Sequence, residues 1–244
     1  KDLLNNGDLF SLTQPKMICD IHRRFLEAGA DIVETNTFGA TSISQSEFFV
    51  DDPREHGRRK DPEFYQKILD DRFLNDLAWE INEQSARQCR EWADRVANAD
   101  GRRRFVAGAI GPLTVSLTNS PDADDAGFRV VTFDQVKNAY IHQIRALIAG
   151  GSDVLLVETC QDILQAKCAV AACFDAMKNV GKRVPVQVQV TLEATGTMLL
   201  GTEIGAALTA LEVFDVDAIG LNCATGPLEM NDAVRYLGVN STKY

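Results

Sequence analysis

The sequence predicts an α/β protein in which parallel strands alternate with helices. Short apolar runs end in Gly, Pro or polar residues, and amphipathic segments of helix length separate them. The strand-helix units recur about every thirty residues in the second half of the chain, a spacing typical of βα units. A doubly wound sheet and a (β/α)8 barrel both fit this alternation.

Each element follows from a local signal. Thr13 is expected to cap a first helix, with Pro15 in its first turn, and Gly29 to end it. One long amphipathic helix is expected over 64–97, and Thr132 with Gln135 forms a capping box that opens another. Further helices are expected from Asp162, over 204–214 and over 227–238, and the five strands over 31–38, 105–110, 153–157, 184–192 and 217–223.

Composition narrows the class of protein. The 244 residues are 45% hydrophobic, and a single α/β barrel domain commonly has this length. The net charge of −10 argues against nucleic acid or an anionic membrane as a partner. Neither a membrane-length apolar run nor a signal peptide is evident, and the six cysteines lack the spacing of a disulfide scaffold. A cytoplasmic, reduced protein is expected, with Cys168 and Cys173 as core thiols.

Two segments are expected to be loops. Residues 49–62 are charged and carry two prolines, so we expect a solvated excursion, in which the basic triplet 58–60 is solvated and does not form a binding patch. Residues 114–131 are rich in Ser, Thr, Asp and Gly, and a loop of this length is usually functional or mobile.

Three strands end in a similar way. The segments GADIVETNT (29–37), GSDVLLVETC (151–160) and VDAIGLNC (216–223) each place polar residues where a strand should end. The carboxyl ends of parallel strands meet at one edge, so the three segments suggest one shared site and favour the barrel. Two alternatives stay open: Glu34 and Glu158 could merely cap turns, and Cys223 could be an inert core thiol.

Four motifs carry a family resemblance. The segments 12–41 (LTQPKMICDIHRRFLEAGADIVETNTFGAT), 108–112 (GAIGP), 157–162 (VETCQD) and 220–227 (GLNCATGP) resemble, in this order, the homocysteine S-methyltransferase family. The likeness is greatest to its cobalamin-dependent, methionine-forming branch, in which the homocysteine-binding barrel is the N-terminal module of a longer chain. It implies a (β/α)8 TIM barrel that binds homocysteine and holds zinc through three cysteine thiolates.

The resemblance also assigns residues. Cys223 matches the first zinc cysteine of the family and is therefore the expected metal ligand and catalytic residue. Glu158 matches the carboxylate that holds the substrate ammonium, and Asn36, Thr37 and Asn222 are expected to line the same pocket. Methylcobalamin and methyltetrahydrofolate would bind to cobalamin and folate modules elsewhere in the same polypeptide.

Two departures from the family pattern matter. The adjacent Cys-Cys pair that supplies the other zinc thiolates does not occur, and the first strand with its Asp-Gly turn does not precede Lys1. Residues 1–244 are therefore expected to form one partial homocysteine-binding barrel domain that lacks its first strand and last two strands. Because one thiolate cannot make a tight zinc site, this fragment alone is expected to be inactive.

Two other functions stay open. One is a stand-alone homocysteine methyltransferase that uses S-methylmethionine or betaine; the other is a metal-free binding barrel without catalysis. The betaine-using branch carries an aromatic residue where this chain has Gly39, which favours the cobalamin-dependent branch.

Overall fold

The structure, a computed structural model, describes residues 3–244; residues 1–2 of the predicted domain lie outside the described residues. Its centre is a parallel sheet with the strand order β1-β2-β3-β4-β5. The strands are β1 (Ile32–Glu34), β2 (Phe105–Ile110), β3 (Val154–Cys160), β4 (Val186–Val190) and β5 (Ala218–Leu221). The five predicted strands and their parallel pairing are confirmed.

The strand order distinguishes between the two predicted architectures, a (β/α)8 barrel and a doubly wound sheet. Each strand lies beside its predecessor in the chain, as in a (β/α)8 barrel, whereas a doubly wound sheet reverses its order at a switch point. Among the described residues the sheet is open. Tyr244 pairs with the outer edge of β5, because the amide of Ile219 donates to the Tyr244 carbonyl over 2.9 Å and the Tyr244 amide donates to the Asp217 carbonyl over 3.2 Å.

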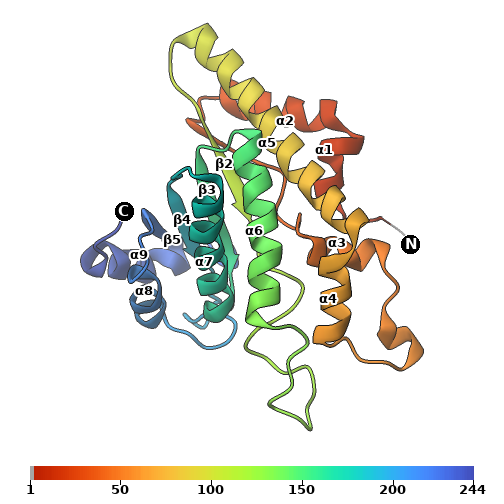
Figure 1. Cartoon of the computed structure of the whole chain (residues 1–244). Helices are drawn as coiled ribbons and strands as arrows, with labels where there is room; N and C mark the ends of the chain where they lie inside the picture. The colour runs from red at the N-terminus through yellow and green to blue at the C-terminus, as the bar shows by residue number, and fades with distance from the viewer. Residues whose placement is uncertain (1–2) are drawn as a thin grey trace.

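Helices cover the sheet and its ends. In Figure 1, α5, α6 and α7 run beside the sheet, α1 and α2 lie near the β1 end, and α8 and α9 lie near the β5 end. None of the helices in residues 3–244 is long and apolar enough to cross a membrane. The helical bounds are η1 (Gly7–Leu9), α1 (Phe10–Thr13), α2 (Pro15–Glu27), α3 (Ser42–Phe49), η2 (Pro53–His56), α4 (Pro62–Asp70), α5 (Arg72–Asp100), α6 (Phe133–Gly150), α7 (Ile163–Val180), α8 (Ile204–Glu212) and α9 (Pro227–Asn240).

The structure corrects three local predictions and confirms one. The helix expected over 64–97 is two helices, because Asp71 is extended (φ −71°, ψ 115°) and its carboxylate caps α5 by accepting from the Leu74 amide over 2.9 Å. Thr13 ends α1 and does not cap α2. In the triplet 58–60, Lys60 is buried between the carboxylates of Glu47 and Asp52 and is not solvated. The capping box of Thr132 and Gln135 is confirmed.

The aspartates of two of the three repeated segments, Asp153 and Asp217, tie strands together at the amino end of the sheet. The Asp153 carboxylate accepts from the Val106 amide of β2 over 2.9 Å, and the Asp217 carboxylate accepts from the Val186 amide of β4 over 2.7 Å. Each carboxylate also pairs with an arginine, Arg90 and Arg183 respectively. Asp153 and Asp217 are thus structural, and a shared site is expected among the polar residues at the other end of the strands.

Gly150 lies where α6 packs closely against α5, and we expect it to be sensitive to substitution. A Cβ atom on Gly150 of α6 would lie 2.5 Å from the Glu83 carbonyl oxygen of α5 and 2.6 Å from the Ala86 Cβ. Gly150→Ala is therefore expected to lower the free energy of unfolding by about 1–3 kcal/mol, measured by urea denaturation. Gly238→Ala is the control, because Gly238 in α9 has no atom within 4 Å of that position. There alanine should raise stability by about 0.5 kcal/mol, and equal effects at both sites would contradict the packing argument.

Candidate active site

Asn222 joins two strand ends that are separated by β4. It follows β5 directly, and its Nδ2 donates to Glu158 Oε2 over 3.1 Å and to Thr159 Oγ1 over 2.9 Å. Its Oδ1 accepts from the Thr159 amide over 2.9 Å. Because both the nitrogen and the oxygen of the amide contact β3, Asn222 holds Glu158 and Thr159 in one orientation. The structure thus brings together Glu158, Asn222 and Cys223, as the sequence predicted.

Thr191 completes the connection from the strand in between. It follows β4, is almost fully buried, and its Oγ1 donates to the Asn222 carbonyl over 3.0 Å. Neither Thr191 nor Thr159 was predicted to belong to the site. The signal was present, because each is a threonine at or just after the end of a predicted strand.

The backbone at the site is strained. The register between β3 and β4 shifts between Val157 and Cys160, so β3 carries one extra residue where Glu158 and Thr159 lie. Thr159, Cys223 and Ala224 have φ of 55°, 61° and 53°, in the left-handed region that non-glycine residues rarely adopt, β-branched ones such as Thr159 least of all. Among residues 3–244, they are three of the four non-glycine residues with positive φ. Such strain typically gathers at functional sites.

Cys223 is exposed, so the alternative of an inert core thiol is wrong for this cysteine. Its Sγ lies 3.4 Å from Thr159 Oγ1. The nearby thiol of Cys160 is different: burial, followed by the carboxylates of Glu158 and Asp162, raises its pKa to about 12. Cys223 therefore supplies the accessible sulfur at this edge of the sheet.

The donor set around Cys223 does not make a metal site by itself. Within residues 3–244, no three or more His, Cys, Asp or Glu residues are placed to hold a metal ion together. Cys168 and Cys173 are fully buried in α7, as the sequence predicted. A structural or catalytic zinc site needs at least three protein ligands, so the described residues provide one thiolate and no complete zinc site.

Glu158 is a buried carboxyl group, and no cationic side chain of residues 3–244 pairs with it. It is 8% exposed, and burial, followed by the charge of the nearby Glu34 carboxylate and a hydrogen bond to it, raises the pKa of Glu158 to about 8. Glu34 ends β1, one of the three strand ends that the sequence suggested as a shared site, with a turn cap as the alternative. The arrangement favours a bound cation, which would offset both the lost hydration and the repulsion between the two carboxylates.

Asn36 and Thr37 lie apart from this cluster. The Asn36 Nδ2 donates to the Gly7 carbonyl over 2.8 Å, towards the N-terminal segment. Thr37 is fully buried, and its Oγ1 donates to the Ala109 carbonyl over 2.8 Å. Both side chains thus support the β1–α3 connection, and the pocket-lining role expected for them stays a prediction.

Asp162 of the VETCQD motif organises the neighbouring loop. Its carboxylate caps α7 by accepting from the Leu164 amide over 2.9 Å. It also accepts from Ser116 Oγ over 3.1 Å and from Thr118 Oγ1 over 2.7 Å. The long loop between β2 and α6 is thereby fixed to the strand that carries Glu158.

Comparisons with known proteins identify the family of this chain. The sequence profile of the family described as homocysteine S-methyltransferase matches residues 1–244. The chain is 40% identical to a methionine synthase of Mycobacterium leprae (strain TN) and 39% identical to one of Mycobacterium tuberculosis (strain ATCC 25618 / H37Rv). Each alignment covers 231 residues, 95% of this chain and 16% of the relative, so the chain spans about a sixth of the length of these relatives.

Solved structures support the fold. The metallated form of the homocysteine methyltransferase MmuM from Escherichia coli superposes with a TM-score of 0.70 at 15% sequence identity, over 97% of this chain and 73% of that protein. Its apo form superposes with a TM-score of 0.63 at 16% identity, over 95% of this chain and 70% of that protein. Since the family profile matches the whole chain, the chain belongs to the homocysteine S-methyltransferase family.

Proposed function

We propose that this chain is the homocysteine-binding module of a cobalamin-dependent methionine synthase, in which a methyl group is transferred to the homocysteine thiol to form methionine. The observation that carries the proposal is the cluster of Glu158, Asn222 and Cys223 at the carboxyl edge of the sheet. It places a buried carboxyl group and an exposed thiol at one edge. The relatives named methionine synthase support the choice of reaction.

In this proposal Glu158 binds the ammonium group of homocysteine. The free protein keeps this carboxyl largely protonated at neutral pH, since its pKa is about 8. An ammonium group that replaces the proton gives Glu158 a partner in its charged form, which lowers the pKa of Glu158 again. Asn222 orients the carboxylate through its bond to Oε2, and Thr191 in turn holds the Asn222 backbone.

Cys223 is proposed as one ligand of a zinc ion, beside the position of the substrate sulfur. The other ligands would come from outside residues 3–244, because those residues do not complete the donor set. The part of the reaction that belongs to residues 3–244 is to bind and orient homocysteine. The Cys223 thiol is exposed and can receive such a partner.

We propose that the chain is one module of a longer polypeptide. Further strands outside residues 3–244 would close the sheet into a (β/α)8 barrel, continuing the pairing that Tyr244 begins on β5. Methylcobalamin and methyltetrahydrofolate would bind to other modules, for which relatives about six times longer than this chain leave room. A cytoplasmic location, without nucleic acid or a membrane as partner, belongs to the same proposal.

The methyl donor distinguishes this proposal from its alternatives. The full-length protein is incubated with homocysteine and, separately, methylcobalamin, S-methylmethionine or betaine, and methionine is measured. We expect methionine with methylcobalamin only. Methionine formed only from S-methylmethionine or betaine would identify a stand-alone methyltransferase. If no donor gives methionine and homocysteine does not bind, the chain is a metal-free barrel without catalysis. The incomplete donor set in residues 3–244 favours this alternative.

A further inference from the structure

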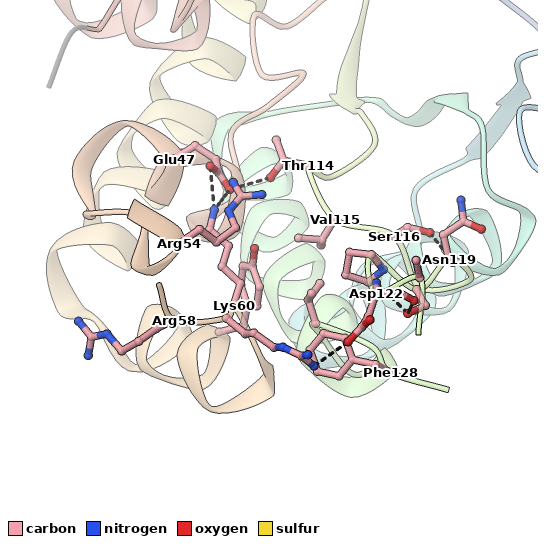
Figure 2. Close-up of a pocket in the computed structure, with 16 residues that line it drawn as sticks. Glu47, Arg54, Arg58, Lys60, Thr114, Val115, Ser116, Asn119, Asp122 and Phe128 are labelled. Carbon is pink, nitrogen blue, oxygen red and sulfur yellow. Dashed lines mark hydrogen bonds and ion pairs between the residues drawn. The ribbon is translucent and has the colours of Figure 1, made fainter. Parts of the chain in front are cut away.

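A cavity of about 670 Å³ lies between two loops and is not used by the proposed function. One wall is the segment between α3 and α4 together with the start of α4, and the other is the loop between β2 and α6 (Figure 2). This volume falls within the usual range of small-molecule sites. The second wall is fixed to the edge of the sheet through Ser116 and Asp162.

An ion-pair network around the buried Lys60 side chain holds the base of the cavity. The Lys60 side chain is 9% exposed, and its Nζ donates to the Glu47 carboxylate over 2.8 Å and 3.0 Å. Lys60 Nζ also lies 3.5 Å from the carboxylate of Asp52, which accepts hydrogen bonds from Nε and Nη2 of the Arg54 guanidinium. The charges of these four side chains compensate one another, so the network shapes the cavity without needing a ligand.

The mouth of the cavity carries two further arginines. Arg59 reaches across it to Asp122 on the opposite wall, with 2.8 Å between Nη1 and Oδ2, and its guanidinium lies over the Phe128 ring at 5.4 Å. Arg58 is exposed, and its guanidinium has no ion-pair or hydrogen-bond partner among residues 3–244. Figure 2 shows the Arg58 side chain extending away from the other labelled groups, so it must turn to reach a ligand in the cavity.

The lining has the chemistry of an anion site. It contains four cationic and two carboxylate side chains, and once Asp52, which pairs with Arg54 and Lys60 from outside the lining, is counted, an excess of one positive charge remains in a chain whose net charge is −10. A guanidinium binds phosphate or carboxylate oxygens in pairs, and Val115, Val130 and Phe128 add an apolar surface. We propose that this cavity binds a small ligand that carries a phosphate or carboxylate group on an apolar body, with the anionic group held by Arg58 and Arg59.

In this arrangement Asp122 competes with the ligand for Arg59. The Arg59–Asp122 ion pair joins the two walls, and the Arg59 side chain in this pair is 67% exposed. An exposed pair of this kind contributes little stability, so an anion can replace the carboxylate at small cost. Removing the Asp122 charge should therefore strengthen anion binding, whereas removing the Arg58 charge should weaken it.

The test is calorimetric titration of the full-length protein with inorganic phosphate and phenyl phosphate at low ionic strength. We expect phenyl phosphate to bind more tightly than phosphate, because its ring meets the apolar wall. Arg58→Ala should weaken phenyl phosphate binding by roughly tenfold or more, and Asp122→Asn should strengthen it by a few-fold. The amide side chain of the Asp122→Asn variant keeps an oxygen that can accept from the Asp124 amide, so the loop should keep its conformation.

Arg24→Ala is the matched control, since it removes the same charge from an exposed side chain on α2. It should leave phenyl phosphate binding unchanged. Equal weakening in Arg24→Ala and Arg58→Ala would show general charge attraction and overturn the proposal, as would an absence of phenyl phosphate binding to the parent protein. Homocysteine binding, measured in the same variants, should stay unchanged. A result that overturns the anion site therefore leaves the proposed homocysteine-binding function untouched.

Discussion

Replacing Cys223 with alanine is expected to abolish zinc retention and methyl transfer to homocysteine together in the full-length protein. Cys223 is exposed at the edge where Glu158 and Asn222 meet, and in the proposed function its thiolate is one of the zinc ligands. Loss of a thiolate leaves too few protein ligands for tight binding, so turnover should fall by more than about 100-fold. Zinc per chain is measured by elemental analysis and turnover by methionine formation.

The control is Cys19→Ala, which removes a half-buried thiol from α2. It should keep the zinc content and the activity of the parent protein. The Cys223→Ala variant should remain folded, since an exposed side chain contributes little packing. If that variant retains its zinc and its turnover, Cys223 is not a metal ligand and the proposed role is wrong.

Glu158→Gln is expected to weaken homocysteine binding by roughly 10- to 100-fold, the usual cost of losing a hydrogen bond to a charged group. Glutamine keeps the shape of the side chain and can still bond to Asn222, so the fold of the site should not change. Direct titration with homocysteine measures the effect. An affinity equal to that of the parent protein would exclude Glu158 as the ammonium-binding group.

The same variant tests a pH dependence. Because burial and the Glu34 carboxylate raise the pKa of Glu158 to about 8, the ionised form that binds ammonium becomes populated only as pH approaches and passes 8. Homocysteine affinity of the parent protein should therefore rise between pH 6.5 and roughly 8.5, relative to that of Glu158→Gln at each pH. Comparison at equal pH cancels the titration of homocysteine itself.

Glu34→Gln supplies the matched control for this pH effect. It removes the like charge that contributes to the raised pKa of Glu158 but leaves the buried environment in place. The midpoint of the pH dependence should shift to lower pH, while homocysteine still binds. An unchanged midpoint would mean that Glu34 does not act on Glu158.

Local signals predicted most of the elements. The capping box at Thr132, the cap at Asp162 and the five apolar runs each act within a few residues, so the sequence alone reveals them. The break at Asp71 was missed because one aspartate among many charged residues does not stand out as a helix cap. The burial of Lys60 was missed because its partners Glu47 and Asp52 become visible only once the chain turns back on itself.

Residues close together in the chain were enough to predict the α/β class, the alternation of parallel strands and helices, and the placement of Glu158 and Cys223 at strand ends. Three contacts became known only from the folded chain: Asn222 crosses to Glu158, Glu34 approaches Glu158, and Arg59 meets Asp122 across a cavity. The partners in each pair are more than sixty residues apart in the chain. Secondary structure depends on near neighbours, whereas these contacts depend on how strands and loops are brought together when the sheet packs.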